Sequence, residues 1–316
     1  MASEPRRRGR WCAVDGVLLL DKPVGPTSNA ALQTARRLHR AAKAGHTGTL
    51  DPLASGLLPV LFGEATKFSG FLLDADKSYR ARVQLGSRTT TGDAEGDVVE
   101  RSKVAVDAAA IEAVLERFRG EIEQVPPMHS ALKREGRPLY AYARAGLEVE
   151  RRARRVTIRE LAWHDFADEA FTLEVRCSKG TYVRSLAADI GAALGCGAHL
   201  AALRRTAIGR FDVSEAFSLA QLEGLGDAER LAALRPVDSL LADFPEVHLE
   251  QAGAQALAHG RDVHGFGGLS GLVRAYGPGG AFLGLAEALS GGPLRAKRLL
   301  ATQDTREDQL EPCAEG

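Results

Sequence analysis

Residues 77–86 read KSYRARVQLG, and apolar and polar side chains alternate along this stretch. Tyr79, Ala81, Val83 and Leu85 would lie on one face, with two arginines and a glutamine between them on the other. A period of two is typical of a β-strand, because successive side chains of a strand point to opposite sides. The stretch therefore predicts a strand of a sheet with one buried face.

Further strands and helices are predicted on both sides of this strand. Short apolar runs bounded by turn-forming residues predict strands over 16–23, 57–63, 154–166 and 171–180. Apolar residues at helical spacing predict helices over 30–44, 64–74, 107–120 and 182–195. Thr27 or Ser28 would cap the first of these helices, and Thr181 the last. The mixture of elements predicts an α+β domain.

Two parts of the chain depart from this pattern. Residues 126–146 are punctuated by proline and glycine and carry several basic side chains, which is more typical of an arm than of a core. After about residue 240, a short helix precedes short apolar segments broken by glycines, as in a small β-rich domain. We therefore predict a main domain over 1–240 with an insertion at about 124–146, and a second domain with an acidic tail over 241–316.

Composition narrows the class of protein. The chain has 316 residues, of which 45% are hydrophobic and 26% charged, as is ordinary for a globular protein with a sizeable core. No stretch approaches the roughly 18–20 apolar residues of a membrane span, and the N-terminal MASEPRRRGRW lacks the apolar core of a signal peptide, so a cytoplasmic protein is expected. The four cysteines never occur at CxxC spacing, which indicates free thiols.

The distribution of charge is more informative than its sum. The 41 basic and 41 acidic residues give a formal net charge of zero, which by itself argues against a nucleic acid as partner. Basic residues nevertheless cluster at 6–10, 35–46, 151–155 and 203–210, while acids gather in the tail 304–316. Several basic patches therefore remain available to a polyanion.

Residues 45–56, GHTGTLDPLASG, hold one carboxylate, Asp51, between Leu50 and Pro52. A loop of this kind is suited to presenting one acid, although an Asp-Pro pair is also common in ordinary turns.

The glycine-rich spots match neither GxGxxG nor a P-loop, and no HExxH, GxSxG or His/Cys cluster at metal spacing occurs. An enzyme with this sequence is expected to need neither a cofactor nor a metal.

Five stretches carry a resemblance to a known family. They are GVLLLDKPVGPTSN (16–29), AGHTGTLDPLASGLLPVLFGEATKF (44–68), KSYRARVQLG (77–86), PPMHSALK (126–133) and CSKGTYVRSLAADIG (177–191) with the following LGCGAHLAALRRTAIGRF (194–211). In this order they resemble the bacterial tRNA pseudouridine-55 synthases, the TruB family, over roughly residues 15–215. The resemblance implies a pseudouridine synthase fold with a mixed, largely antiparallel central sheet, followed by a small PUA-like RNA-binding domain. It also implies isomerisation of one T-loop uridine of tRNA, in which a C5 to C1′ bond replaces the N1 to C1′ bond without a cofactor or metal.

The resemblance also assigns catalytic roles. Asp51 matches the catalytic aspartate, which acts as a nucleophile or a base, and Arg184 matches the arginine that pairs with it. Tyr79 matches the residue that stacks on the uridine after it has been flipped out of the loop. Taken alone, Tyr79 would be a core residue of its strand, and Arg184 an exposed arginine near a helix start.

Further residues are candidates for substrate binding. His46 matches the residue that packs among the extruded loop bases, and Leu203 matches an apolar wall of the uridine pocket. Tyr182 is two residues from the matched arginine, and Lys22 and Lys67 are candidate contacts to phosphate or to the motif loop. Leu203 and the two lysines also have an ordinary interpretation, Leu203 as a core residue and the lysines as solvated side chains.

The expected partner is the T-stem-loop of tRNA, bound by a monomer without guide RNA or a membrane. Two other functions stay open. One is a guide-RNA-dependent synthase of the archaeal and eukaryotic type, against which the insertion at 124–146 and the short C-terminal domain argue. The other is a non-catalytic RNA-binding or tRNA-folding module, against which the complete set Asp51, Tyr79 and Arg184 argues.

Overall fold

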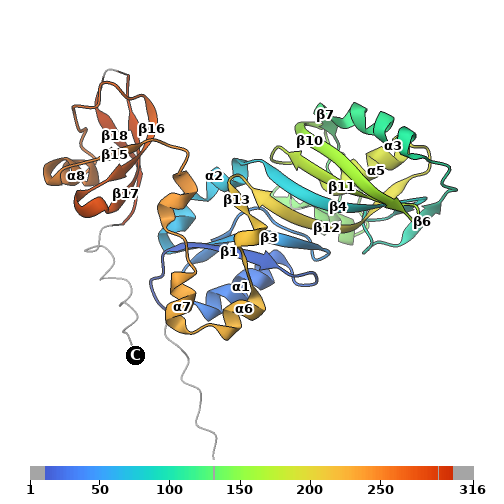
Figure 1. The fold of residues 1–316 in the computed structure, drawn as a ribbon, viewed down its shortest axis with the longest axis horizontal. Helices are drawn as coiled ribbons and strands as arrows, with labels where there is room; N and C mark the ends of the chain where they lie inside the picture. The colour runs from blue at the N-terminus through green and yellow to red at the C-terminus, as the bar shows by residue number, and fades with distance from the viewer. Residues whose placement is uncertain (1–10, 131, 291, 302–316) are drawn as a thin grey trace, which may run out of the picture.

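The computed structural model describes residues 11–130, 132–290 and 292–301 (Figure 1). Its main body is a ten-stranded sheet with the order β14-β1-β3-β12-β4-β11-β10-β7, in which β2 pairs with β3 and β13 with β12. The strands are β1 (Gly16–Lys22), β2 (Ala44–His46), β3 (Ala54–Phe62), β4 (Lys77–Leu85), β7 (Gly120–Gln124), β10 (Arg154–Ala167), β11 (Ala170–Cys177), β12 (Ala198–Ile208), β13 (Phe211–Asp212) and β14 (Phe217–Ser218). Pairs β1–β14 and β3–β12 are parallel and the other pairs antiparallel, so the prediction of a mixed, largely antiparallel sheet is confirmed.

Most of the helices, which are all short, lie against this sheet or at its ends, whereas the fourth belongs to an arm and the last packs in the C-terminal domain. They are α1 (Ser28–Leu38), α2 (Ser69–Asp74), α3 (Ala108–Leu115), α4 (Leu139–Arg144), α5 (Val183–Ala193), α6 (Leu219–Gly224), α7 (Asp227–Ala232) and α8 (Gln251–Ala258). The predicted helix 64–74 is divided into a 3₁₀ turn, η1 (Gly63–Phe68), and α2. None of the helices in the described part of the chain is long and apolar enough to cross a membrane.

One predicted helix cap is confirmed and one is wrong. Thr27 caps α1, since its hydroxyl accepts a hydrogen bond from the Ala30 amide at 3.1 Å. Thr181 does not cap α5, because the residue at the cap position is Tyr182 and the Thr181 hydroxyl instead donates to the Ser178 carbonyl at 2.9 Å.

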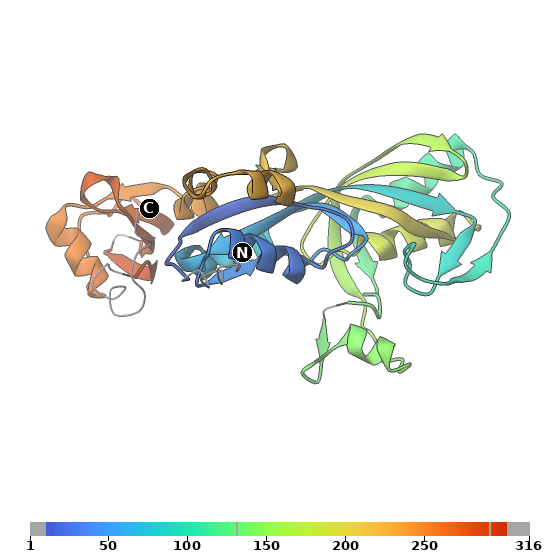
Figure 2. The ribbon, with the colours of Figure 1, turned by 90° about the horizontal axis from the view of Figure 1, so that it is seen from below.

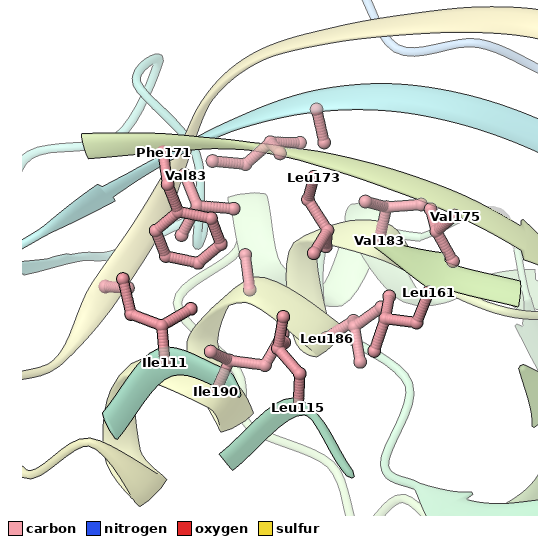
Figure 3. Packing of buried hydrophobic residues seen from close by; sticks show 14 of the residues in the cluster. Val83, Ile111, Leu115, Leu161, Phe171, Leu173, Val175, Val183, Leu186 and Ile190 are labelled. Carbon is pink, nitrogen blue, oxygen red and sulfur yellow. The ribbon is translucent and has the colours of Figure 1, made fainter. Parts of the chain in front are cut away.

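The alternation along residues 77–86 is present in β4. Ala81, Val83 and Leu85 are buried, while Arg80 is exposed on the opposite face. The buried face packs with β11 against α3 and α5 (Figure 3). The side chains labelled there are Val83, Ile111, Leu115, Leu161, Phe171, Leu173, Val175, Val183, Leu186 and Ile190. Since each such burial contributes about 1.5–3 kcal/mol, this layer fixes α5 on the sheet.

Strand β12 was not among the predicted elements, yet it lies in the middle of the sheet. It runs parallel to β3, where Leu203 is opposite Ala54, and antiparallel to β4, where Leu203 is opposite Ala81. Its sequence AHLAALRRTAI consists mostly of residues that favour helices and shows no clean alternation. The hydrogen bonds that β12 makes to β3 on one edge and to β4 on the other outweigh the helical preference of its residues.

At Gly56, strands β3 and β12 approach too closely for a side chain. Gly56 has φ of +101°, and a Cβ atom built there would lie 2.2 Å from the backbone oxygen of Arg205. We expect Gly56→Ala to lower the free energy of unfolding by at least about 3 kcal/mol, because neither the positive φ nor a backbone clash is relieved by a rotamer change.

Chemical denaturation of Gly56→Ala alongside Gly70→Ala measures this effect. Gly70 lies in α2 with nothing within 4 Å of its built Cβ, so alanine there should be neutral or stabilise by up to about 1 kcal/mol. Equal stability of the two variants would contradict the close approach.

An arm projects from the main body (Figure 2). It contains a hairpin of β8 (Lys133–Arg134) and β9 (Arg137–Pro138), followed by α4. A second small hairpin pairs β5 (Ser87–Thr89) with β6 (Val98–Arg101). The arm falls within the predicted insertion.

The C-terminal part forms a second sheet with the order β15-β16-β17-β18, which confirms a β-rich C-terminal domain. Its strands are β15 (Glu246–His248), β16 (Gly271–Tyr276), β17 (Phe282–Ala288) and β18 (Leu294–Leu299). Lys67 and Glu64 of η1 join the two domains: Lys67 donates to the Leu299 carbonyl at 3.1 Å, and Glu64 accepts from the Ala301 amide at 2.6 Å. The predicted acidic tail lies outside the described residues.

The prediction of free thiols holds for two cysteines. Cys177 and Cys196 are free and buried. For Cys12 the prediction is wrong, because this residue is disulfide-bonded. Pairing depends on which cysteines meet in space, and sequence spacing does not report that. Cys313 lies outside the described residues.

Candidate active site

The loop between β2 and β3 presents Asp51 on a rigid support. The Ser28 hydroxyl at the start of α1 donates to the Leu50 carbonyl at 2.9 Å and accepts from the Leu50 amide at 2.7 Å. On the other side of the aspartate, the Pro52 carbonyl accepts from the Gly25 amide at 2.9 Å. Because the residues on both sides are held, the direction of the Asp51 side chain is largely fixed.

Arg184, in the first turn of α5, faces this carboxylate. Its Nη2 lies 2.9 Å from Oδ2 of Asp51, and its Nη1 lies 3.4 Å from Oδ2 of Asp93. The guanidinium also donates to the carbonyls of Thr91, at 3.1 Å, and His129, at 2.7 Å. With four partners and 6% exposure, Arg184 has one available geometry, which a planar fork satisfies better than an ammonium group would.

The groups around Asp51 shift its pKa in opposite directions. Burial raises the pKa of Asp51, the neighbouring guanidinium of Arg184 lowers it, and the nearby Asp93 raises it. Its side chain still has 42% of its surface exposed, on the side away from the arginine. The result is a carboxylate that is paired on one side and open to a pocket on the other, and such a group is well suited to act as a nucleophile or a base.

The exposed side of Asp51 opens into a pocket of about 230 Å³. Its walls come from the Asp51 loop, β4, the arm base, the start of α5 and β12. The lining residues are Thr49, Leu50, Asp51, Tyr79, Ser130, Thr181, Tyr182, Val183, Arg184 and Leu203. The pocket is smaller than the roughly 300–1,000 Å³ of typical small-molecule sites, so it suits one planar ring better than a whole cofactor.

Five of the candidates named from the sequence meet in this pocket. Asp51, Tyr79, Tyr182, Arg184 and Leu203 all line it. Tyr79 and Leu203 are contributed by the neighbouring strands β4 and β12, and both also pack against the core.

Three other candidates lie outside the pocket. Lys22 is fully buried and donates to the carbonyls of Pro23 and Pro26, both at 2.8 Å, so it fits a contact to the loop after β1 and not one to phosphate. Lys67 takes part in the contact between the two domains. His46 precedes the Asp51 loop, and its Nδ1 is buried without a hydrogen-bond partner among the described residues. Burial lowers the pKa of His46.

Sequence reasoning missed three polar residues that support the pocket. Asp93 is 2% exposed and is the second acid at Arg184. Arg205 is 1% exposed and donates to a carbonyl of the Asp51 loop. Gln124 holds the backbone of Tyr182 through two hydrogen bonds, of 2.7 and 3.1 Å. In the sequence, Asp93 is marked only by the neighbouring glycine in TTTGDAEGD, and Arg205 only by the double arginine in ALRRT. Neither pattern indicates which residue the side chain would contact.

A second cavity, of about 330 Å³, lies where the arm meets the main body. It is strongly basic, with one acid, Glu150, against five cations. The basic residues that line it are Lys133, Arg134, Arg151, Arg152 and Arg154. Nearby on α4, Arg144 lies over the ring of Tyr140, which is 42% exposed. This surface is suited to an anionic partner that also offers flat rings.

Family models cover most of the chain. Residues 36–183 match the N-terminal domain of the TruB family pseudouridylate synthases, and residues 184–242 match the tRNA pseudouridylate synthase B C-terminal domain. Residues 245–300 match the C-terminal model of pseudouridine synthase II TruB.

Relatives and solved structures agree with these matches. The tRNA pseudouridine synthase B of Azoarcus sp. (strain BH72) is 62% identical over 92% of this chain and 96% of the relative, and that of Thiobacillus denitrificans is 58% identical over 92% and 97%. Among solved structures, a chain of a Cbf5-Nop10-Gar1 complex is 27% identical, with a TM-score of 0.69 over 96% of this chain and 92% of that one. With its fold, its pocket and these matches taken together, the chain belongs to the TruB family of pseudouridylate synthases.

Proposed function

We propose that this protein is a tRNA pseudouridine synthase that isomerises the T-loop uridine at position 55, with Asp51 as the reacting carboxylate. The observation that carries the proposal is the Asp51–Arg184 pair at the wall of a pocket that suits one base. Relatives that are 58–62% identical are named as tRNA pseudouridine synthase B, which supports tRNA as the substrate class.

In this proposal the uridine leaves the folded loop and enters the pocket, at a cost of a few kcal/mol for unstacking. The ring of Tyr79 and the side chain of Leu203 supply the flat and apolar contacts that offset this cost. Asp51 then acts at the ribose as nucleophile or base, the N1 to C1′ bond breaks, the uracil turns, and the C5 to C1′ bond forms. The proton lost from C5 is balanced by one gained at N1, so no cofactor is required.

The basic cavity at the arm base supports a grip on the RNA backbone. Five cations line this cavity, and Ser130, from the same arm base, lines the uridine pocket. Phosphate contacts of this kind give affinity without sequence information, so selectivity falls to the splayed bases of the loop. A protein of zero net charge thus binds RNA through local patches.

We infer that the protein works as a monomer in the cytoplasm without guide RNA. The solved structures that resemble it include a chain from an H/ACA RNP bound to a substrate RNA containing 2′-deoxyuridine, at 27% identity. The curated relatives are about twice as similar, at 55–62% identity. This difference favours the stand-alone enzyme over the guide-dependent one.

The decisive experiment compares two RNAs at matched ionic strength, with no guide RNA or other protein present. We expect an isolated T-stem-loop to be converted at its single target uridine, and a linear RNA of the same composition to react at least about tenfold more slowly, because it lacks the folded loop. Mapping of pseudouridine in both products measures this. A T-stem-loop with cytidine at the target position is the matched control.

Two outcomes would contradict the proposal in different ways. Equal rates on the folded and linear RNAs would refute recognition of loop shape. Activity on neither RNA, restored by a guide RNA and partner proteins, would favour a guide-dependent synthase.

A further inference from the structure

Gln124, the last residue of β7, has a buried side chain whose amide group is directed at one distant residue. It is 2% exposed. Its Nε2 donates to the Tyr182 carbonyl at 3.1 Å, and its Oε1 accepts from the Tyr182 amide at 2.7 Å. A backbone amide can only donate and a carbonyl can only accept, so the two contacts together fix which way round the side-chain amide lies. An apolar side chain would avoid the cost of burying an amide group, so this glutamine calls for a role beyond filling space.

The residue that Gln124 holds is the one from which α5 starts. Tyr182 is at the cap position of this helix, and in the described structure its side chain makes no capping hydrogen bond. Its carbonyl accepts the first hydrogen bond of the helix, from the Leu186 amide at 3.0 Å, as well as the one from Gln124. A helix end without a cap is otherwise prone to fray, so the two hydrogen bonds from Gln124 take the place that a cap would have.

Two further hydrogen bonds join the start of α5 to the segment that Gln124 begins. This segment, residues 124–130, is the arm base, which leads from β7 into the arm. The Ser185 hydroxyl donates to the Val125 carbonyl at 3.3 Å, and Nη2 of Arg184 donates to the His129 carbonyl at 2.7 Å. The start of α5 is thus tied to the arm base at these two points as well as through Gln124.

The contact between Arg184 and Asp51 needs this kind of support. Val183 and Leu186 pack α5 onto the core of the sheet, but apolar contacts are not directional, whereas hydrogen bonds are. The guanidinium lies 2.9 Å from the carboxylate, and a shift of about 1 Å would take the two groups beyond hydrogen-bond distance. Misplacement by about this distance can lower a catalytic rate by about 10²-fold.

We propose that Gln124 is a positioning residue for the isomerisation, whose amide fixes the start of α5 so that Arg184 meets Asp51. Gln124 touches neither the carboxylate nor the pocket, and it acts through the backbone of Tyr182. The proposal rests on the proposed function for its substrate, and on the two hydrogen bonds to Tyr182 for its mechanism.

The first test compares two glutamines that each hydrogen-bond a backbone amide at the start of a helix. Gln124→Met keeps the length of the side chain but removes both hydrogen bonds. It should lower the single-turnover rate of pseudouridine formation by at least about tenfold, with RNA affinity changed by less than about threefold. Gln221→Met is the matched control, because Oε1 of Gln221 accepts from the Ser218 amide at 2.8 Å at the start of α6, and this glutamine does not line the pocket. Its rate should stay within about twofold of the wild type. A wild-type rate in Gln124→Met would overturn the proposal.

A second variant and a double-mutant cycle separate this role from general support of the fold. Gln124→Asn keeps the amide but is one methylene too short to reach both backbone groups of Tyr182, so its rate should fall as well; it carries the test if thermal unfolding shows that Gln124→Met is not folded. In an Arg184→Lys background the planar fork is absent, so either substitution of Gln124 should slow the reaction by no more than about threefold further. If the effects instead multiply in full, Gln124 does not act through Arg184 and the proposal fails.

A third measurement needs no substrate. The charged groups that act on the Asp51 carboxyl are Arg184 and Lys22, which lower its pKa, and Asp93, which raises it. Of these, only Arg184 belongs to the segment that Gln124 holds. In protein labelled with ¹³C at the aspartate carboxyls, the Asp51 resonance, assigned by its loss in Asp51→Asn, should titrate at higher pH in Gln124→Met than in the wild type, because a displaced guanidinium no longer favours the charged form. A role confined to stability would not move this titration, so an unchanged value would refute the positioning role. Because the readout is independent of RNA, it survives a failure of the proposed function.

Discussion

Replacing Asp51 by asparagine is expected to reduce the single-turnover rate of pseudouridine formation at least about 10³-fold while leaving RNA affinity within about threefold of the wild type. Asparagine has the same shape and can still accept a hydrogen bond from Arg184, but it carries no charge with which to attack a ribose or abstract a proton. The loop around it is held by Ser28 and Gly25, whose hydrogen bonds do not involve the carboxylate. The fold should therefore be unaffected.

Rate and affinity must be measured separately for this variant, by pseudouridine mapping and by equilibrium binding of the T-stem-loop. Asp227→Asn provides a matched control, because Asp227 is an exposed aspartate that pairs with Arg40 and Arg230 far from the pocket. Its rate should stay within about twofold of the wild type. Substantial turnover by Asp51→Asn would remove Asp51 from the mechanism.

Substitution of Arg184 is expected to have the second largest effect. Arg184→Lys keeps the charge but loses the planar fork, and a single ammonium cannot reach Asp51, Asp93 and two carbonyls together. We expect a rate loss of about 10²-fold or more for lysine, and a larger one for Arg184→Gln, with thermal unfolding used to confirm that both variants are folded. A wild-type rate in Arg184→Lys would mean that the arginine does not position Asp51.

Substitution of Arg184 should also change how the reaction rate depends on pH. Burial raises the pKa of Asp51 and Arg184 lowers it, so removing the cation should raise that pKa further. If the reaction needs the ionised carboxylate, activity is lost as pH falls through this pKa. The acidic limb of the pH–rate profile should therefore move to higher pH in Arg184→Gln, and less in Arg184→Lys. Profiles that coincide with the wild type would contradict this assignment.

The sequence predicted the architecture well wherever local patterning and packing agree. The alternation over 77–86 indicates a strand, and in β4 Ala81, Val83 and Leu85 are buried on the predicted face while Tyr79 is partly buried. Strand β12 was missed for the opposite reason, because AHLAALRRTAI has a helical composition and becomes a strand only between two partners. In place of the single helix expected over 64–74, the structure has a 3₁₀ turn, η1, followed by α2.

The residues of the candidate site likewise fall into two groups, those that were predicted from the sequence and those that were missed. Residues that reach the pocket itself, such as Asp51 and Tyr79, were found because they lie in stretches that resemble a family. Residues that act through others, such as Asp93 and Arg205, have no local signature. Their partners are far away in sequence: Arg184 is 91 positions from the former, and the Gly48 carbonyl is 157 positions from the latter. Only the folded sheet brings these groups together.

The central place of β12 constrains how the chain can fold while it is being synthesised. Until residues 198–208 have left the ribosome, β3 and β4 have no strand between them, and each presents an unpaired edge. At about 5–20 residues per second, the interval between completion of β4 and arrival of β12 lasts roughly 6–25 s. Open edges are sites of aggregation, so a nascent chain halted before residue 198 should be a client for chaperones that bind extended segments.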